Sequence, residues 1–361
     1  YSFNLDESKS KLLLLTKRKK IWRHSFYGEY FVLDLPTKTV FPITKNNDDL
    51  RNVKLSPDGT KVAYVRKDNN LYIFDLNRKK EKRLTKNGSS TYLNGHFGWV
   101  YEEEFGSYDA YRWSPNSKHI AYWQVDQSKV PVFRMFDELG LYPKIQEIHY
   151  PKAGQTNPTM SIFVVDVNRG RSKKMDIKDS NDKYYPWMKW INNESLVVMR
   201  MNRLQNFWEF LTVSRSNGKS TAGLTESDPN GWVDLHRNYR FLENGNILWI
   251  SERTGWKHLF LHSKNGKLIN QITDGEWEVK RIVHIDENKN KIYFTSNKES
   301  VFETRFYSIN FDGSGLKLLT NEEGSHSIKV LPKGDSFIDS FSSLKQPQKH
   351  LLKDMNGKLI K

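Results

Sequence analysis

Hydrophobic and polar positions along the chain repeat one pattern of short, β-prone segments joined by turns. In the clearest copy, partly alternating apolar residues run through 53–55, 61–65 and 71–76, and Leu84-Thr85 closes the unit. Pro57-Asp58-Gly59 separates the first two segments. The proline fixes φ, the aspartate carboxylate can bond to nearby backbone amides, and the glycine tolerates positive φ. Together these three residues favour a tight turn. The pattern therefore predicts successive β-strands.

Related copies of this unit recur along the whole chain. They begin at six further positions, which are Tyr1, Tyr111, Met188, Tyr239, Val283 and Ile328. The closing threonines Thr44 and Thr85 lie 41 residues apart, and Thr225, Thr273 and Thr320 follow one another at 48 and 47 residues. Blades of four-stranded propellers repeat at roughly 40 to 50 residues. Between Thr85 and Thr225, two units are enlarged by insertions.

These seven units predict an all-β fold, a β-propeller of four-stranded blades. A single unit cannot bury both of its faces, and radial stacking against its neighbours solves that problem. A β-sandwich is the structural alternative, which explains the strands and turns but not the period. The chain lacks the alternation of strands and helices that indicates a parallel α/β domain.

Composition supports a folded protein and limits the possible chemistry. Hydrophobic residues make up 37% of the 361 residues, enough for a core. The net charge of +15 could attract nucleic acid, but the basic runs 17–20 and 78–83 lie beside strand-like segments and accompany no nucleic-acid-binding motif. We therefore expect exposed strand ends or turns there.

With no cysteine there is no disulfide or thiol nucleophile. The apolar run 12–15 is too short to span a membrane.

No catalytic residue can be assigned from the sequence. The chain lacks a Gly-x-Ser-x-Gly nucleophile elbow, a phosphate-binding glycine loop and a His-Glu-x-x-His zinc motif. The sequence Asp-Gly-Ser-Gly at 312–315 has the wrong spacing and is interpreted as a hairpin turn. His258 and His262 are four residues apart, but the residues around them alternate as in a strand. We therefore expect no metal site and no cofactor.

One acidic segment interrupts the repeat, with Glu102, Glu103 and Glu104 placed among aromatic residues. Successive side chains of a strand point to opposite faces, so a strand cannot bring Glu103 and Glu104 together. A short helical turn over about 99–105 would let both reach one cavity and leave Glu102 pointing elsewhere. Such a carboxylate pair could hold a metal, transfer protons or bind a cation such as a peptide α-ammonium, whose pKa is about 8. A solvated charge run is the alternative.

Several longer motifs are unusual enough to point to a family. They are Trp22-Arg-His-Ser-Phe, Trp99-Val-Tyr-Glu-Glu-Glu-Phe, Trp113-Ser-Pro-Asn, Tyr150-Pro-Lys-Ala-Gly, Asn157-Pro-Thr, Phe163-Val-Val-Asp, Gly231-Trp-Val with Arg237, and Gly275-Glu-Trp-Glu-Val. In order and spacing they resemble the propeller of the dipeptidyl peptidase IV family, which are prolyl oligopeptidase-type serine peptidases. The resemblance runs nearly from end to end.

The resemblance implies a substrate-binding site and no catalytic residue in this chain. Glu103 and Glu104 would bind the α-ammonium of a peptide with a free N-terminus. Arg23 would contact a substrate carbonyl and help to neutralise the glutamates, and Arg237 would line the outer part of the same pocket. His236 stands where the family often has an aromatic residue, so the side-chain preference of this subsite is open.

The resemblance also implies a parent enzyme that releases N-terminal dipeptides, after proline or alanine, through an α/β-hydrolase domain. Residues 1–361 would form the propeller, with the glutamate insertion at about 94–110 and an arm at about 127–158 used in homodimer contacts. Seven of eight expected blades are visible, and we expect the C-terminal hydrolase domain to be absent. The location would be periplasmic, cell-surface or secreted, and the lack of cysteine suggests a bacterial member. A non-catalytic propeller used as a protein-interaction scaffold is the alternative.

Overall fold

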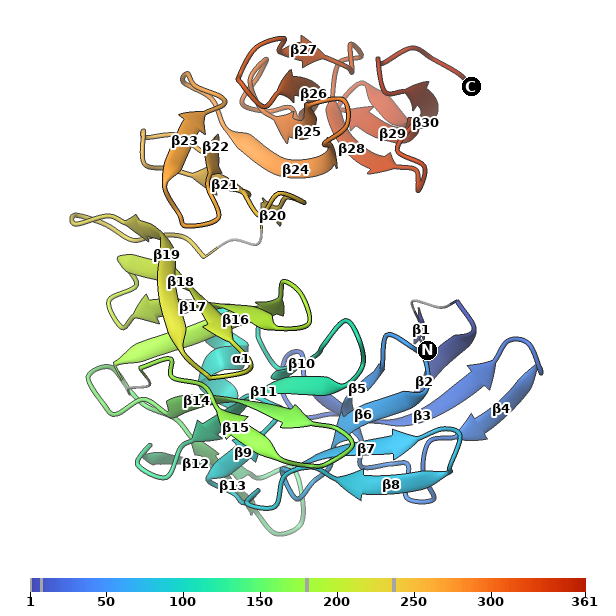
Figure 1. Ribbon diagram of the computed structural model, residues 1–361, viewed down its shortest axis with the longest axis vertical. Coiled ribbons are helices and arrows are strands. Elements are labelled where there is room, and N and C mark those ends of the chain that lie inside the picture. The colour runs from blue at the N-terminus through green and yellow to red at the C-terminus, as the bar shows by residue number, and fades with distance from the viewer. Residues whose placement is uncertain (1, 7–8, 179–181, 236–237) are drawn as a thin grey trace. The chain divides into compact units, whose positions relative to one another are not determined.

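The computed structural model describes residues 2–6, 9–178, 182–235 and 238–361, which form 30 strands and one short helix (Figure 1). The predicted all-β class is therefore confirmed. Residue contacts divide the chain into two compact units, Tyr1–Ala222 and Gly223–Lys361. The described sheets are antiparallel, and strands adjacent in the sequence pair with one another in most of them.

The first unit contains three main sheets, one hairpin and the first three strands of a fourth sheet, whose last strand begins in this unit and ends after Ala222. The first sheet is β1 (Ser2–Leu5), β2 (Lys11–Lys20), β3 (Phe26–Asp34) and β4 (Thr39–Pro42). The second is β5 (Arg51–Leu55), β6 (Lys61–Val65), β7 (Leu71–Asp75) and β8 (Lys80–Arg83). The third is β10 (Tyr111–Trp113), β11 (His119–Asp126), β14 (Thr159–Asp166) and β15 (Ser172–Lys174), with β9 (Tyr92–Asn94) paired to β11.

The fourth sheet is β16 (Lys183–Trp190), β17 (Ser195–Asn202), β18 (Phe207–Ser214) and β19 (Ser220–Ser227). Between β11 and β14 the chain forms a separate two-stranded hairpin, β12 (Val132–Asp137) with β13 (Lys144–His149). The helix α1 (Trp99–Phe105) lies between β9 and β10 in the sequence.

The second unit contains three further sheets. They are β20 (Tyr239–Phe241), β21 (Ile247–Ser251), β22 (His258–His262) and β23 (Leu268–Gln271); then β24 (Val279–Asp286), β25 (Lys291–Ser296), β26 (Arg305–Asn310) and β27 (Lys317–Leu318); and last β28 (Ser325–Val330), β29 (Ser336–Ser343) and β30 (Gln346–Asp354). The seven predicted repeat units thus correspond to seven main sheets among the described residues, and the first strand of each sheet contains or adjoins the predicted start. The predicted hairpin turn at 312–315 is also confirmed.

Burial on both faces explains why these sheets stack as propeller blades. In β6, Val62 and Tyr64 pack into a core shared with the first sheet. Ala63 and Val65 of the same strand pack into a core shared with the third sheet. Because successive side chains alternate between faces, one apolar strand joins two neighbouring blades. A two-sheet sandwich is excluded for the described strands, and the fold class is the predicted β-propeller of four-stranded blades.

The repeated closing threonines have a structural cause. The hydroxyl oxygens of Thr85, Thr273 and Thr320 each accept a hydrogen bond from a backbone amide of the third strand of their blade, at 2.9, 2.9 and 3.0 Å. All three side chains are buried. A threonine therefore satisfies a strand amide that would otherwise lose its partner, and buried amides rarely go unpaired.

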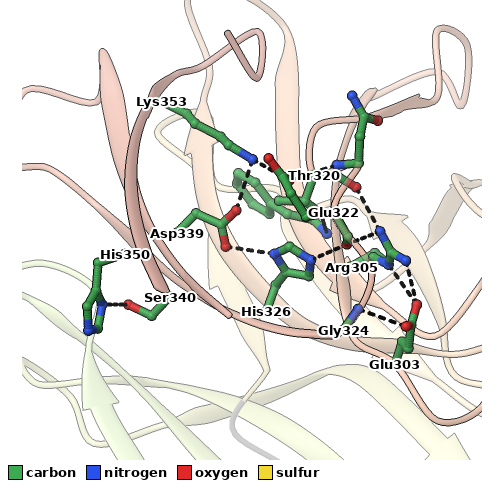
Figure 2. A network of polar contacts seen from close by, with 12 residues as sticks. Glu303, Arg305, Thr320, Glu322, Gly324, His326, Asp339, Ser340, His350 and Lys353 are labelled. Carbon is green, nitrogen blue, oxygen red and sulfur yellow. Dashed lines mark hydrogen bonds and ion pairs between the residues drawn. The ribbon is translucent and has the colours of Figure 1, made fainter. Parts of the chain in front are cut away.

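A buried polar network ties the last sheet together, with one residue from each of its strands (Figure 2). Asp339 on β29 accepts from His326 Nδ1 at 2.7 Å and from Lys353 Nζ at 3.1 Å. Lys353 Nζ also lies 2.6 Å from Glu322 Oε2, and His326 Nε2 lies 2.9 Å from the carbonyl oxygen of the same residue. The network therefore links three strands to the turn that precedes them.

We expect Asp339→Asn to destabilise the last sheet by about 3 to 5 kcal/mol, because it removes one charge from a buried ionic network. Urea unfolding followed by tryptophan fluorescence measures the change. Asp335→Asn, the same substitution at an exposed aspartate beside β29, is the control and should shift stability by less than about 0.5 kcal/mol. Equal unfolding curves for both variants would contradict the role given to the network.

Candidate functional site

The acidic segment forms the helix α1, as predicted. The helix runs from Trp99 to Phe105 and follows Gly98, which has an extended backbone. It ends at Gly106, whose φ of 58° lies in the left-handed region and whose amide donates to the carbonyl of Tyr101. Glycine is the residue that adopts this helix-terminating conformation at least cost. The two glycines therefore delimit the turn that carries the three glutamates.

Buried aromatic residues fix the position of α1 in the first unit. Tyr101 stacks on Phe97 with ring centroids 4.7 Å apart, and its hydroxyl oxygen accepts from the backbone amide of Tyr185 at 2.9 Å. Trp123 Nε1 donates to the carbonyl of Tyr185 at 2.9 Å. Burial raises the pKa of Tyr101, so the hydroxyl remains neutral. The helix is thus bound to β16, far away in the sequence.

The three consecutive glutamates have three different environments, because helical residues turn by about 100° from one to the next. Glu103 is half-buried and accepts from Arg23 Nε at 3.2 Å. Glu104 is exposed and accepts from Gln205 Nε2 at 2.5 Å. Glu102 is buried and accepts from the backbone amides of His24 and Ser25. The sequence expectation that Glu102 points elsewhere is confirmed.

The structure brings some of the predicted site residues together. Arg23 meets Glu103 across 80 residues of sequence, and Glu104 lies next to Glu103 on the same helix. His236 and Arg237 lie outside the described residues. The binding roles of all five residues stay predictions.

Sequence reasoning missed Gln205, which lies 101 residues from its partner Glu104. Gln205 has a φ of 56°, a left-handed conformation that is uncommon for residues other than glycine, asparagine and aspartate. It lies in the turn between β17 and β18 and is largely buried. The flanking Asn202 and Asn206 indicate a turn, but they signal neither a left-handed glutamine nor its contact with an acidic helix.

A cavity of about 760 Å³ adjoins Arg23 in the first unit. Its basic lining residues come from β2, the following loop and β5, and they are Arg18, Lys20, Arg23, His24 and Lys54. Lys17, one residue from Arg18 along β2, instead pairs with Glu29 at 3.0 Å. The basic run 17–20 is exposed at a strand end, as predicted. Because successive side chains of a strand alternate between faces, Arg18 and Lys20 of this run line the cavity.

One acidic residue of the cavity lining is already paired with two cations. Asp109 lies 2.6 Å from Lys54 Nζ and 3.1 Å from Arg112. Burial lowers the pKa of Lys54 to about 8, although Asp109 opposes the shift. The cavity therefore presents a net positive potential beside the glutamate helix.

We expect Lys54 to lose its proton near pH 8, whereas an unshifted lysine does so near about pH 10.4. Competitive acylation over a pH series, with labelled peptides quantified by mass spectrometry, measures this midpoint. Asp109→Asn should lower the midpoint further because it removes the carboxylate that favours the ammonium. A midpoint that rises on this substitution would contradict the assignment.

The described residues contain no group of three or more His, Asp or Glu placed to hold a metal ion. His258 and His262 lie on the strand β22, as the alternation predicts. His258 Nδ1 contacts the hydroxyl of Thr273 at 3.0 Å and its Nε2 the carbonyl of Gly275 at 2.8 Å.

Within the described part of the chain, no helix has the length and hydrophobicity needed to cross a bilayer.

The main antiparallel sheets of the described residues define the class of this protein as a β-propeller region. The family model for the dipeptidyl peptidase IV N-terminal region matches residues 6–348. The chain therefore belongs to the dipeptidyl peptidase IV N-terminal region family.

Individual proteins support the same placement. The chain is 28% identical to dipeptidyl peptidase 4 of Trichophyton rubrum over 376 aligned residues, covering 99% of the chain and 48% of that protein. It is 34% identical to a probable dipeptidyl-aminopeptidase B of Aspergillus niger over 345 residues, covering 86% and 38%. The chain thus spans about half the length, or less, of these relatives.

A solved structure gives the same result. The crystal structure of Porphyromonas gingivalis dipeptidyl peptidase 4 matches 99% of the chain and 51% of its own, with a TM-score of 0.91 and 28% identity. A putative dipeptidyl aminopeptidase IV from Bacteroides ovatus matches the fold, with a TM-score of 0.75 at 22% identity over 97% of the chain and 50% of its own. Similar proteins come from fungi and bacteria, so a bacterial origin stays a prediction.

Proposed function

We propose that this chain is the substrate-recognition and gating region of a serine exopeptidase that removes dipeptides from peptide N-termini. Catalysis would take place in a C-terminal α/β-hydrolase domain of the same protein. The observation that carries the proposal is the ion pair between Arg23 and Glu103, next to Glu104 on a helix held by buried aromatic residues. Membership of the dipeptidyl peptidase IV family supports the assignment.

The proposed ligand of Glu103 and Glu104 is the α-ammonium group of the substrate. Two neighbouring carboxylates repel one another, and a cation between them relieves that repulsion. Arg23 supplies one positive charge to Glu103, and the exposed Glu104 remains accessible to a second. Gln205 is an amide, so it orients Glu104 without neutralising it.

Binding the amino end would fix the length of peptide that fits before the scissile bond. Two extended residues span only about 7 Å. Longer N-terminal overhangs would be excluded, and the binding energy at the amine would orient the reacting carbonyl. The proposed products are dipeptides of the Xaa-Pro or Xaa-Ala type. The proposed location is periplasmic, cell-surface or secreted.

In the full-length enzyme, Glu104→Ala should lower kcat/KM on an Xaa-Pro-anilide by on the order of 10- to 100-fold, because it removes a charge-assisted contact with the substrate amine. N-acetylated substrates should be poor for the wild-type enzyme. Steady-state kinetics on matched free and acetylated substrates measure both effects.

Glu194→Ala is the matched control, since Glu194 is an exposed glutamate of the same unit paired with Arg215. It should leave kcat/KM unchanged. Equal turnover of free and acetylated substrates would refute the proposed binding of the substrate α-ammonium by Glu103 and Glu104. The gene beyond Lys361 is a separate test, in which a Gly-x-Ser-x-Gly followed by Asp and His supports a peptidase. Its absence would favour the interaction-scaffold alternative.

We also propose that the β12–β13 hairpin is a homodimer arm. Its outer residues are apolar yet exposed, with Phe136 at 65%, Leu139 at 100% and Leu141 at 94%. Exposed apolar patches of this kind mark interaction sites. Tyr150, just after β13, packs against Trp99 of α1 with ring centroids 4.2 Å apart. The arm therefore begins beside the glutamate helix.

Phe136→Asp combined with Leu141→Asp should convert a dimer of the full-length protein into a monomer, because a dimer would bury these charges without partners. Light scattering coupled to size-exclusion chromatography gives the mass. Phe302→Asp, at a loop residue that is 91% exposed, is the control and should leave the dimer intact. An unchanged mass for the double variant would rule out a homodimer role of the β12–β13 hairpin.

A further inference from the structure

We propose that Glu102 is a positioning residue for Arg23 and binds no substrate itself. This inference rests on the proposed function of Arg23 and Glu103. Glu102 is 1% exposed, so a peptide cannot reach its carboxylate without displacing the helix. Its partners are instead backbone groups of the loop that carries Arg23.

The contact is made by a single carboxylate oxygen. Glu102 Oε1 accepts from the backbone amide of His24 at 2.6 Å and from that of Ser25 at 2.8 Å. Hydrogen bonds to an ionised acceptor are roughly twice as strong as neutral ones. The loop itself is tight, because the amide of Ile21 donates to the carbonyl of Ser25 at 2.9 Å. Glu102 therefore holds a compact loop and not a single side chain.

A buried carboxylate also requires positive charge nearby. Arg51 at the start of β5 is 3% exposed, and its guanidinium lies over the ring of Tyr27 at 5.7 Å. Burial lowers the pKa of Arg51, while Tyr27 and Glu102 act in the opposite direction. This interaction places Arg51 in the electrostatic environment of Glu102. The two backbone amides and the Arg51 guanidinium are therefore the groups that offset the burial of the Glu102 side chain.

Adjacent residues of α1 thus hold two parts of one loop. Glu102 binds the backbone just after Arg23, and Glu103 binds the Arg23 side chain. The backbone contact limits where the guanidinium can lie, and the Arg23 side chain, 67% exposed, would otherwise be free to sample many rotamers. Glu102 would therefore act on substrate binding through Arg23.

A double-mutant cycle in the full-length enzyme tests this. Glu102→Ala should lower kcat/KM on an Xaa-Pro-anilide by about 10- to 100-fold, because small misplacements of positioning groups have effects of that size. In an Arg23→Met background the same substitution should cost less than about twofold, since coupled residues are not additive. Glu102→Gln keeps an acceptor oxygen, so its kcat/KM should fall less than that of Glu102→Ala. If the alanine variant does not fold, Glu102→Gln replaces it in the double-mutant cycle.

Hydrogen exchange of the peptide covering residues 21–26 provides a readout independent of activity. Exchange there should become faster in Glu102→Gln than in the wild-type protein. Glu209→Gln is the control, since Glu209 is a buried glutamate that pairs with Arg200 at 2.6 Å. It should leave exchange at 21–26 unchanged, and its kinetic effect should be the same in the wild-type and Arg23→Met backgrounds.

Equal losses of kcat/KM in the two backgrounds, or unchanged exchange at 21–26, would overturn the positioning role. The proposed function fails by a different result, in which the wild-type enzyme turns over free and acetylated substrates equally. In that case the exchange measurement still decides whether Glu102 holds the loop.

Discussion

The hydrogen bond between the Tyr185 amide and the buried Tyr101 hydroxyl is the contact on which the site depends. It joins the single described helix to the fourth sheet, and it fixes the helix in rotation because Tyr101 also stacks on Phe97. With that rotation set, one glutamate faces the loop at 21–25, the next faces Arg23, and the third is exposed. The chemistry at the surface is therefore determined by a contact in the interior.

The blades provide the frame for this contact. Strands such as β6 bury alternate side chains against the preceding and the following sheet, so that neighbouring blades share apolar residues. The loop of Arg23, the helix α1 and the turn of Gln205 come from the first, third and fourth sheets of one unit. Residues separated by 80 to 101 positions can meet because stacked sheets bring their loops together.

The repeat, the all-β class and the helical turn could be predicted from the sequence, because each depends on local signals. Thr85, Thr273 and Thr320 recur because each accepts from a strand amide. Strand geometry excluded Glu103 and Glu104 from reaching one cavity within a strand. The hydrogen-bond partners of Glu102 and Glu104 could not be predicted from the sequence. Glu102 binds backbone amides, which leave no trace in residue identity. Gln205 is itself the left-handed residue of its turn, and the flanking Asn202 and Asn206 do not specify that conformation at a glutamine. The subsite at His236 and Arg237 stays a prediction.

The three glutamates of α1 are identical in chemistry and differ only in direction. Each successive residue of a helix is rotated by about 100°, so an inserted or deleted residue between Gly98 and Glu102 would pass every role to the wrong side chain. A buried carboxylate would then lack its amides, and Arg23 would lack its partner. This segment should accordingly be constant in length among active relatives, whereas the tip of the β12–β13 hairpin can vary in length without changing any glutamate's direction.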